Sequence, residues 1–166
     1  MGSLKLSFLV VTLVILGLAV SAFGQEASIA PDGTLKTAVT AKMKEDSATY
    51  EITEGTINQS NLFHSFERFN LLQNENALFR GPNSISNIIS RVTGGTRSSI
   101  FGTIRSDISG ANLFLLNPSG FVFGPGASLD LSGSFHASTA DYLTFDDGNI
   151  FYADPTVGSD VLTVAQ

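Results

Sequence analysis

The sequence predicts an all-β fold. Corresponding apolar residues of successive short runs, Ile88, Ile100 and Leu113, lie 12 and 13 residues apart, and later intervals shrink to about 8. Asn, Ser, Gly and Thr recur between the runs, and no segment keeps a helical period over about 10–15 residues. The short runs favour a β-solenoid, but the irregular period leaves a sandwich and a barrel open.

Residues 1–24 predict a signal peptide. One lysine precedes an apolar core over 8–20, and small residues follow. About 13 uninterrupted apolar residues are fewer than the roughly 20 that a membrane span needs. We therefore expect cleavage after Ala22 or after Gly24.

The mature chain, residues 25–166, is acidic. Loss of Lys5 with the signal leaves eight Lys and Arg and 15 Asp and Glu residues, a net charge of −7. Nucleic acid and anionic membrane surfaces would not attract such a chain, so we expect no nucleic-acid partner and no stable membrane insertion. The chain has no Cys, which is compatible with export but does not require it.

The mature chain begins with the weaker strand signals. A Pro-Asp-Gly turn at 31–33 precedes a segment rich in Thr, Val and Ala, a candidate strand, and the charged residues of 42–46 form a patch that we expect to be solvated. Tyr50 and Ile57, on either side of a Glu-Gly turn at 54–55, indicate a pair of strands.

The segment 61–69 fits a strand or one helical turn, because its apolar residues are spaced by 1, 3 and 3. From residue 84 the pattern is one of short strands separated by turns. These strands are expected at 86–92, 98–104, 111–116, 121–123, 128–131 and 134–138.

Two proline-containing turns lie among these strands. Asn, Pro and Gly at the first, second and fourth positions of 117–120 predict a type I turn, in which the Asn117 side chain bonds the backbone two residues on. Pro-Gly at the centre of 124–127 predicts a type II turn. Alternation predicts an apolar interior made of Leu113, Leu115, Phe121, Phe123, Leu129, Leu131 and Phe135.

The tail contains a hairpin signal. Runs at 142–145 and 150–153 flank Asp-Asp-Gly-Asn, and Asp-Gly suits a tight type I′ turn. A further apolar strand is expected at 160–166.

Residues that could carry catalysis or bind a metal are few. His64 and His136 each adjoin a Phe, and neither has a partner at a zinc-binding spacing. If Phe135 points inward, alternation directs His136 outward. The carboxylates at 146, 147 and 154 could hold calcium weakly, but a hairpin turn explains the first two more simply. No nucleophile-elbow, phosphate-loop or EF-hand motif occurs, so we expect no enzyme activity, no catalytic residue, no metal and no cofactor.

Several blocks, in this order, resemble one known family. They look like the two-partner secretion (TPS) domain, also called the filamentous haemagglutinin N-terminal or haemagglutination activity domain, especially in its cyanobacterial form. The resemblance covers most of residues 28–166 and is specific because the blocks occur together. The main blocks are "NLFHSFERF" (61–69), "SNIISRVTGG" (86–95), "SSIFGTI" (98–104) and "ANLFLLNPSGFVFGPGASLDLSGSFHASTADYL" (111–143).

The resemblance implies a right-handed parallel β-helix with N-terminal capping strands and a short extra-helical hairpin. It implies a secretion-targeting domain of a filamentous-haemagglutinin-like exoprotein of a Gram-negative bacterium. The chain would cross the inner membrane through the Sec translocon, lose its signal to signal peptidase, and enter the periplasm. An outer-membrane TpsB-type β-barrel transporter would recognise the domain through its periplasmic POTRA domains. The domain would then nucleate β-helix folding at the cell surface, and the product would be secreted or surface-bound.

Site residues follow by matching this sequence to the family's motifs. Asn117, Pro118 and Gly120 match an Asn-Pro-x-Gly motif implicated in secretion, with Ser119 where Asn or Ala is common. A second motif is matched by Asn61, Leu62, Phe63, His64, Ser65 and Phe66. "TINQS" precedes it where relatives more often have a Gly-containing turn. The usual continuation after Val164 is missing, which suggests a fragment of a longer exoprotein.

Two other functions stay open at this point. One is a surface adhesin that binds glycans directly. The other is a β-helical carbohydrate-active enzyme, which would need carboxylates and basic side chains, such as Arg105, Asp107 and Asp130, gathered on one exposed face.

Overall fold

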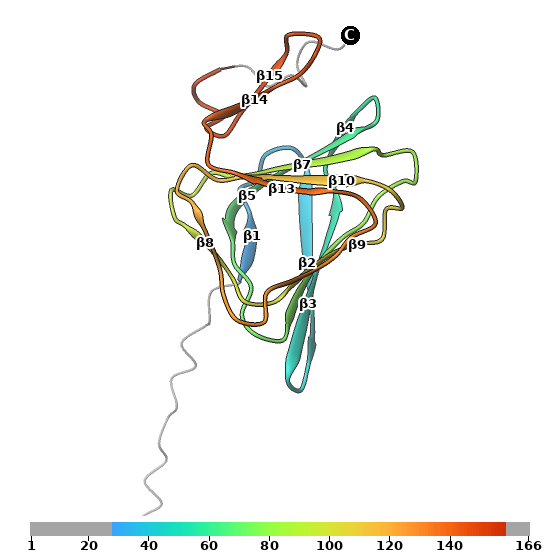
Figure 1. The fold of residues 1–166 in the computed structure, drawn as a ribbon, viewed down its shortest axis with the longest axis vertical. Coiled ribbons are helices and arrows are strands. Elements are labelled where there is room, and N and C mark those ends of the chain that lie inside the picture. The colour runs from blue at the N-terminus through green and yellow to red at the C-terminus, as the bar shows by residue number, and fades with distance from the viewer. Residues whose placement is uncertain (1–27, 159–166) are drawn as a thin grey trace, which may run out of the picture.

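The computed structural model describes residues 28–158, which form strands and turns (Figure 1). These residues contain no helix long and apolar enough to cross a membrane. The predicted signal peptide and the strand expected at 160–166 lie outside the described residues. The strands are β1 (Ile29–Pro31), β2 (Thr37–Lys44), β3 (Ser47–Glu54), β4 (Thr56–Asn58), β5 (Asn61–Phe69), β6 (Glu75–Phe79), β7 (Asn87–Val92), β8 (Ser98–Ile100), β9 (Thr103–Ser106), β10 (Asn112–Leu116), β11 (Phe121–Phe123), β12 (Ser128–Asp130), β13 (Phe135–Ser138), β14 (Tyr142–Thr144) and β15 (Ile150–Tyr152).

Parallel strands stack into the coils of a β-helix with three faces. On the first face β5, β7, β10 and β13 pair in parallel, which places Leu62, Ile88, Leu113 and Phe135 in one row. On the second face β3, β6, β9 and β12 pair in the same way, and β8 with β11 forms the third. The predicted all-β fold and the parallel β-helix are confirmed, and the sandwich and barrel alternatives are wrong.

The interior of the β-helix is apolar. Alternate residues of each strand point inward, and the rings of Phe66, Phe69 and Phe79 meet there with centroids 5.2, 6.2 and 6.4 Å apart. All three side chains are fully buried or nearly so. Burial of one such side chain contributes roughly 1.5–3 kcal/mol, so this cluster is a main source of stability in the first coil.

Antiparallel strands close the N-terminal end, which we call the closed end. β1 and β4 pair with β5, and β2 pairs with β3, so the expected capping strands are present and 61–69 is a strand. The strand pair predicted around Tyr50 and Ile57 is wrong, because β3 pairs with β2 and β6 while β4 pairs with β5. Positive φ at both Glu54 (60°) and Gly55 (81°) carries the chain from the second face to the first.

The hairpin of β14 and β15 lies outside the coils, beyond the first face (Figure 1). It forms a second apolar cluster in which its Phe151 and Ala153 pack with the outward-facing side chains of Phe63, Ile89 and Leu116. The predicted extra-helical hairpin is therefore confirmed. It covers an outer face of the first sheet that would otherwise expose large apolar side chains.

The turns partly match their predictions. Gly126 has a φ of 89° and the N–H of Ala127 donates to Gly124 O at 3.1 Å, as a type II turn at 124–127 requires. The type I′ turn predicted for the hairpin is wrong. Of its residues only Gly148 has a positive φ, 83°, and its N–H donates to Phe145 O. The two aspartates are the central residues of the turn that this bond closes and keep the negative φ that L-residues prefer, and Gly148 follows them in the left-handed conformation.

The C-terminal end, which we call the open end, consists of β11, β12 and β13, each the last strand of its sheet. Leu113 and Leu115 are buried as predicted, but Phe123 and Leu129 are 47% and 51% exposed. Both point inward, in register with the buried Ile100 and Ile104, but their predicted burial is wrong, because within residues 28–158 no further coil stacks on them. Partial burial against the core is seen for Phe121, Leu131 and Phe135.

Candidate functional site

The 117–120 turn has the predicted geometry. The N–H of Gly120 donates to Asn117 O at 2.9 Å, and the N–H of Ser119 donates to the Asn117 side-chain Oδ1 at 2.9 Å. Gly120 has a φ of 95°, a left-handed conformation that favours glycine. Pro118 and Ser119 are exposed, so they are the members of this motif that a partner can touch.

Asn117 itself is buried, with 1% of its surface exposed. Its Nδ2 donates to Thr96 O and to Ser98 Oγ, each at 3.0 Å, and its N–H donates to Ser138 O at 2.9 Å. The side chain thus joins the turn to the loop of the preceding coil. A buried polar group left without a partner costs about 1–3 kcal/mol, so Asn117 acts by fixing the turn.

The motif at 61–66 lies in β5 at the centre of the first sheet. Leu62, His64 and Phe66 are buried on its inner side, where His64 and Phe66 pack with Phe79. Phe63 belongs to the cluster under the hairpin. Ser65 lies on the same outer side and accepts a hydrogen bond from Arg91. The side chains of residues 62–66 are therefore all packed or hydrogen-bonded within the fold.

Asn61 begins a ladder of side-chain amides along the first face. Asn87 donates from Nδ2 to Asn61 Oδ1 at 2.9 Å, and Asn112 donates to Asn87 Oδ1 at 3.1 Å. The Oδ1 of Asn112 then accepts from the N–H of Ser134 at 3.0 Å. The ladder fixes the register of successive coils, since each rung must lie opposite the next.

His64 is fully buried and neither ring nitrogen has a hydrogen-bond partner among the described residues. Its ring centroid lies 6.1 Å from that of Phe66 and 5.7 Å from that of Phe79. Burial lowers the pKa of His64 to about 4, because the imidazolium would lose its hydration. His64 is therefore a neutral core residue at pH 7. His136 is exposed, as predicted, and stacks on Phe114 at 4.5 Å.

A buried arginine was not predicted from the sequence. Arg91 in β7 is completely buried beneath the hairpin and donates from Nε to Ser65 Oγ (2.8 Å) and from Nη1 to Tyr152 O (3.0 Å). Its guanidinium carbon lies 4.9 Å from the centre of the Phe151 ring. Arg91 therefore fastens the hairpin to the coils. The available signal was the single charged residue in the predicted strand "SNIISRV".

Asp32 completes this polar network from the N-terminal side. Its carboxylate accepts from the hydroxyls of Ser65 (2.5 Å), Thr34 (2.7 Å) and Thr93 (3.0 Å). Burial opposes ionisation of Asp32, but these hydrogen bonds outweigh it and lower the pKa of the carboxyl. The network thus joins the cap, two coils and the hairpin.

The two predicted motifs do not form one site. Asn117 follows β10, whereas 61–66 lies in β5, and β7 separates the two strands. The hairpin reaches both: the Phe151 ring lies 5.2 Å from that of Phe63, and Pro118 lines a groove together with Tyr142 and Tyr152 of the hairpin. The hairpin, not direct contact, connects the two motifs.

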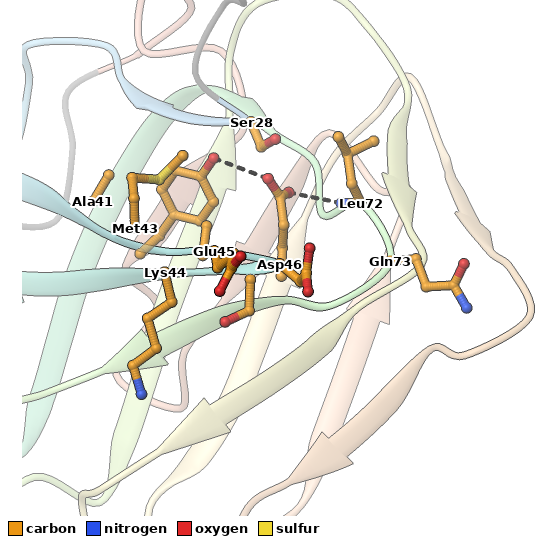
Figure 2. A pocket seen from close by; sticks show the side chains of 12 residues that line it. Ser28, Ala41, Met43, Lys44, Glu45, Asp46, Leu72 and Gln73 are labelled. Carbon is orange, nitrogen blue, oxygen red and sulfur yellow. Dashed lines mark hydrogen bonds between the residues drawn. The ribbon is translucent and has the colours of Figure 1, made fainter.

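A second hollow lies at the closed end, beside the turn that joins β2 and β3 (Figure 2). It has a volume of about 510 Å³, and Met43 and Leu72 on its walls are 72% and 47% exposed. Glu75 holds one wall by accepting from the hydroxyl of Tyr50 (3.1 Å) and the N–H of Leu72 (2.7 Å). Lys44, Glu45 and Asp46 also line the hollow, which is therefore of mixed character. Among the described residues β2 is the last strand of its sheet, so the hollow adjoins an unpaired strand edge.

The charged residues named for an enzyme form ion pairs. Arg105 Nε lies 2.8 Å from Asp130 Oδ2 on adjacent strands of the second face, and Asp107 Oδ2 lies 3.4 Å from Arg80 Nη2. Over residues 28–158 no group of three or more His, Asp or Glu side chains is arranged to hold a metal ion. Asp147 and Asp154 instead accept hydrogen bonds within their own turns.

Comparison with known families gives one match. Residues 27–166 match the family model of the TPS secretion domain. Among curated proteins no match to the chain is found. A TPS domain targets an exoprotein of Gram-negative bacteria to a partner outer-membrane transporter of the TpsB kind, so the product is secreted or displayed on the cell surface. The chain belongs to the TPS secretion domain family, the targeting domains of two-partner secretion exoproteins.

Proposed function

We propose that this domain is recognised in the periplasm by the POTRA domains of a TpsB-type transporter and then nucleates β-helix folding at the cell surface. The proposal includes export by the Sec translocon, removal of residues 1–24 by signal peptidase, and a Gram-negative host of the cyanobacterial type. The observation that carries it is the family match over residues 27–166.

The open end supports the nucleating role. β11, β12 and β13 each have one edge without a neighbouring strand among the described residues, and a free strand edge is a template for the next strand. Phe123, Leu129 and Phe135 also line a hollow of about 290 Å³ there. An incoming coil would bury this apolar surface and pair all three edges.

The closed end supports recognition by strand addition. Within residues 28–158 the outer edge of β2 has no neighbouring strand, so it presents backbone donors and acceptors, and the hollow beside Met43 and Leu72 can take an apolar side chain of an added strand. The chain without its signal should therefore bind the isolated POTRA domains of its cognate transporter. Lack of binding would contradict this part of the proposal.

The main test is secretion of an exoprotein that carries Asn117→Ala. We expect a sharp loss of secretion, because the turn loses its bonds to Thr96 and Ser98. Asn83→Ala is the matched control, since Asn83 is exposed in a loop and should leave export unchanged. Wild-type secretion of the Asn117 variant would overturn the assigned role.

Urea unfolding of the purified domain shows whether a variant has lost only the contacts of the turn or the whole fold. If Asn117→Ala does not fold, Ser98→Ala removes one acceptor of the Asn117 side chain and leaves the hydrogen bonds within the turn in place. A folded variant with reduced secretion supports the proposal, and a folded variant with normal secretion contradicts it.

A further inference from the structure

A groove of about 430 Å³ separates the 117–120 turn from the hairpin. One wall is Pro118, an exposed residue of the turn. The other wall is made by Tyr142, Tyr152, Asp141 and Asp154 of the hairpin and its flanks. The groove therefore lies next to the motif that the proposed function places at the centre of secretion.

The two tyrosines form an aromatic surface within the groove. Tyr142 and Tyr152 are directly opposite each other on β14 and β15, with ring centroids 6.1 Å apart and planes inclined by 58°. Tyr142 is 50% exposed. Tyr152 is only partly exposed, so the exposed ring of Tyr142 is the main surface on which a flat, cationic group can lie.

The charged side chains that line the groove, Asp141 and Asp154, are both acidic, and the buried Arg91 beneath the hairpin acts on Asp154 from behind. Asp141 is exposed and its carboxylate has no hydrogen bond or ion pair among the described residues. Asp154 accepts hydrogen bonds from the Oγ1 and the N–H of Thr156 (2.7 and 2.8 Å), which lower the pKa of its carboxyl and keep it ionised. No basic side chain and no side-chain amide is found among the groove's described lining residues.

The groove is held open by contacts beneath the hairpin. Arg91 donates to Tyr152 O at 3.0 Å, and the N–H of Ala153 donates to Asp141 O at 2.8 Å. These bonds fix the backbone of the strands that carry both tyrosines, so binding costs little conformational entropy. The groove exists only when the hairpin is docked on the folded coils.

We infer that this groove binds an arginine side chain of an extended segment of the partner transporter. A guanidinium can lie on the tyrosine rings and donate to Asp141 in the same pose. A sugar is less well matched, because the described lining lacks the amide and basic groups that pair with hydroxyls from both sides. The inference rests on the proposed function for the identity of the partner.

The first experiment uses a fluorescent hexa-arginine peptide as the probe and the folded domain over 25–166. We expect Asp141→Asn combined with Tyr142→Ala to weaken binding about tenfold. Asp146→Asn, an equal charge change at the exposed tip of the same hairpin, is the control and should leave binding unchanged. No binding by wild type, or equal binding by both variants, would overturn the inference.

The second experiment measures binding of the same proteins to the cognate transporter in nanodiscs. A weaker complex for the groove variant alone supports the inference. An unaltered complex overturns the inference but leaves the proposed function standing, whereas no complex with wild type counts against both. If the groove variant instead loses binding on a glycan array while the peptide never binds, the groove is a sugar site and the inference is wrong.

Discussion

The closed and open ends of the β-helix are built differently, although the strands at both carry alternating apolar and polar residues. At the closed end, β1, β2 and β4 cover the first coil and Phe66 is fully buried. At the open end, Phe123 and Leu129 occupy equivalent inward positions and remain half exposed. Alternation decides which way a side chain points, but only a neighbouring coil decides whether it is buried. The coils are therefore capped at the closed end and exposed for the stacking of another coil at the open end.

The largest expected difference between the ends is in the cost of deleting an aromatic ring. Phe66→Ala should lower the free energy of unfolding by about 3–5 kcal/mol, because it leaves a cavity between Phe69 and Phe79. Phe123→Ala should cost only about 1 kcal/mol, since nearly half of the side chain is already in water. Urea unfolding of both variants measures the difference. Equal losses would show that the open end is as well packed as the closed one.

The closed end should also be the more sensitive to acid. The pKa of His64 is about 4 in the folded chain against an ordinary value of 6.5, so below pH 6.5 the unfolded chain binds a proton that the folded chain refuses. Stability should fall as pH drops from 6.5 and level off below 4, a total of roughly 3 kcal/mol. Urea unfolding at pH 7 and pH 4.5 measures most of this change.

His64→Leu is the control for the acid effect. It replaces the imidazole with an apolar side chain in the same pocket and should abolish the dependence of stability between pH 6.5 and 4. Asp32 affects stability at lower pH. Its pKa is lowered in the folded chain, so the stability that its carboxylate contributes is lost only as the pH falls below the unfolded value of 3.8. A pH dependence that survives in His64→Leu would assign it to other groups.

The sequence predicts the coils better than it predicts what covers them. Regular turn signals and alternation located most strands, and the residues of 117–120 predicted both the turn and the Asn117 side-chain bond. These local patterns do not distinguish a sandwich, a barrel and a solenoid, because the three differ in which strands pair. The resemblance to the TPS domain is what predicted the β-helix. The predicted pairing of β3 with β4 is wrong for the same reason, because strands that are neighbours in the sequence need not pair in the fold.

The candidate site was less predictable. Phe63 and Ser65 lie on the outer side of β5, where alternation alone would expose them. The hairpin covers Phe63, and Asp32 and Arg91 bond to Ser65. Arg91 is a charged residue in a strand and would normally be read as solvated. Its burial depends on Tyr152, which lies 61 residues further along the chain. Such contacts follow from the tertiary fold and leave no local pattern.

The smallest effect on stability, but the sharpest test of the comparison, is expected from a charge placed on the open end. Leu129→Lys should change the free energy of unfolding by less than about 0.5 kcal/mol, because the side chain is 51% exposed. It should nevertheless suppress concentration-dependent association of the domain, since a lysine on a terminal strand opposes the docking of another edge. Sedimentation velocity over a concentration series measures this association.

Leu72→Lys is the matched control at the closed end, where Leu72 is 47% exposed. It makes the same substitution at nearly the same exposure but beside a coil that β1, β2 and β4 already cover, so association through the open end should remain as in the wild type. If both variants suppress association equally, the apolar surface as a whole drives it and the open end has no special role. If only Leu129→Lys does, the half-exposed residues of β11, β12 and β13 form the surface on which the next coil is built.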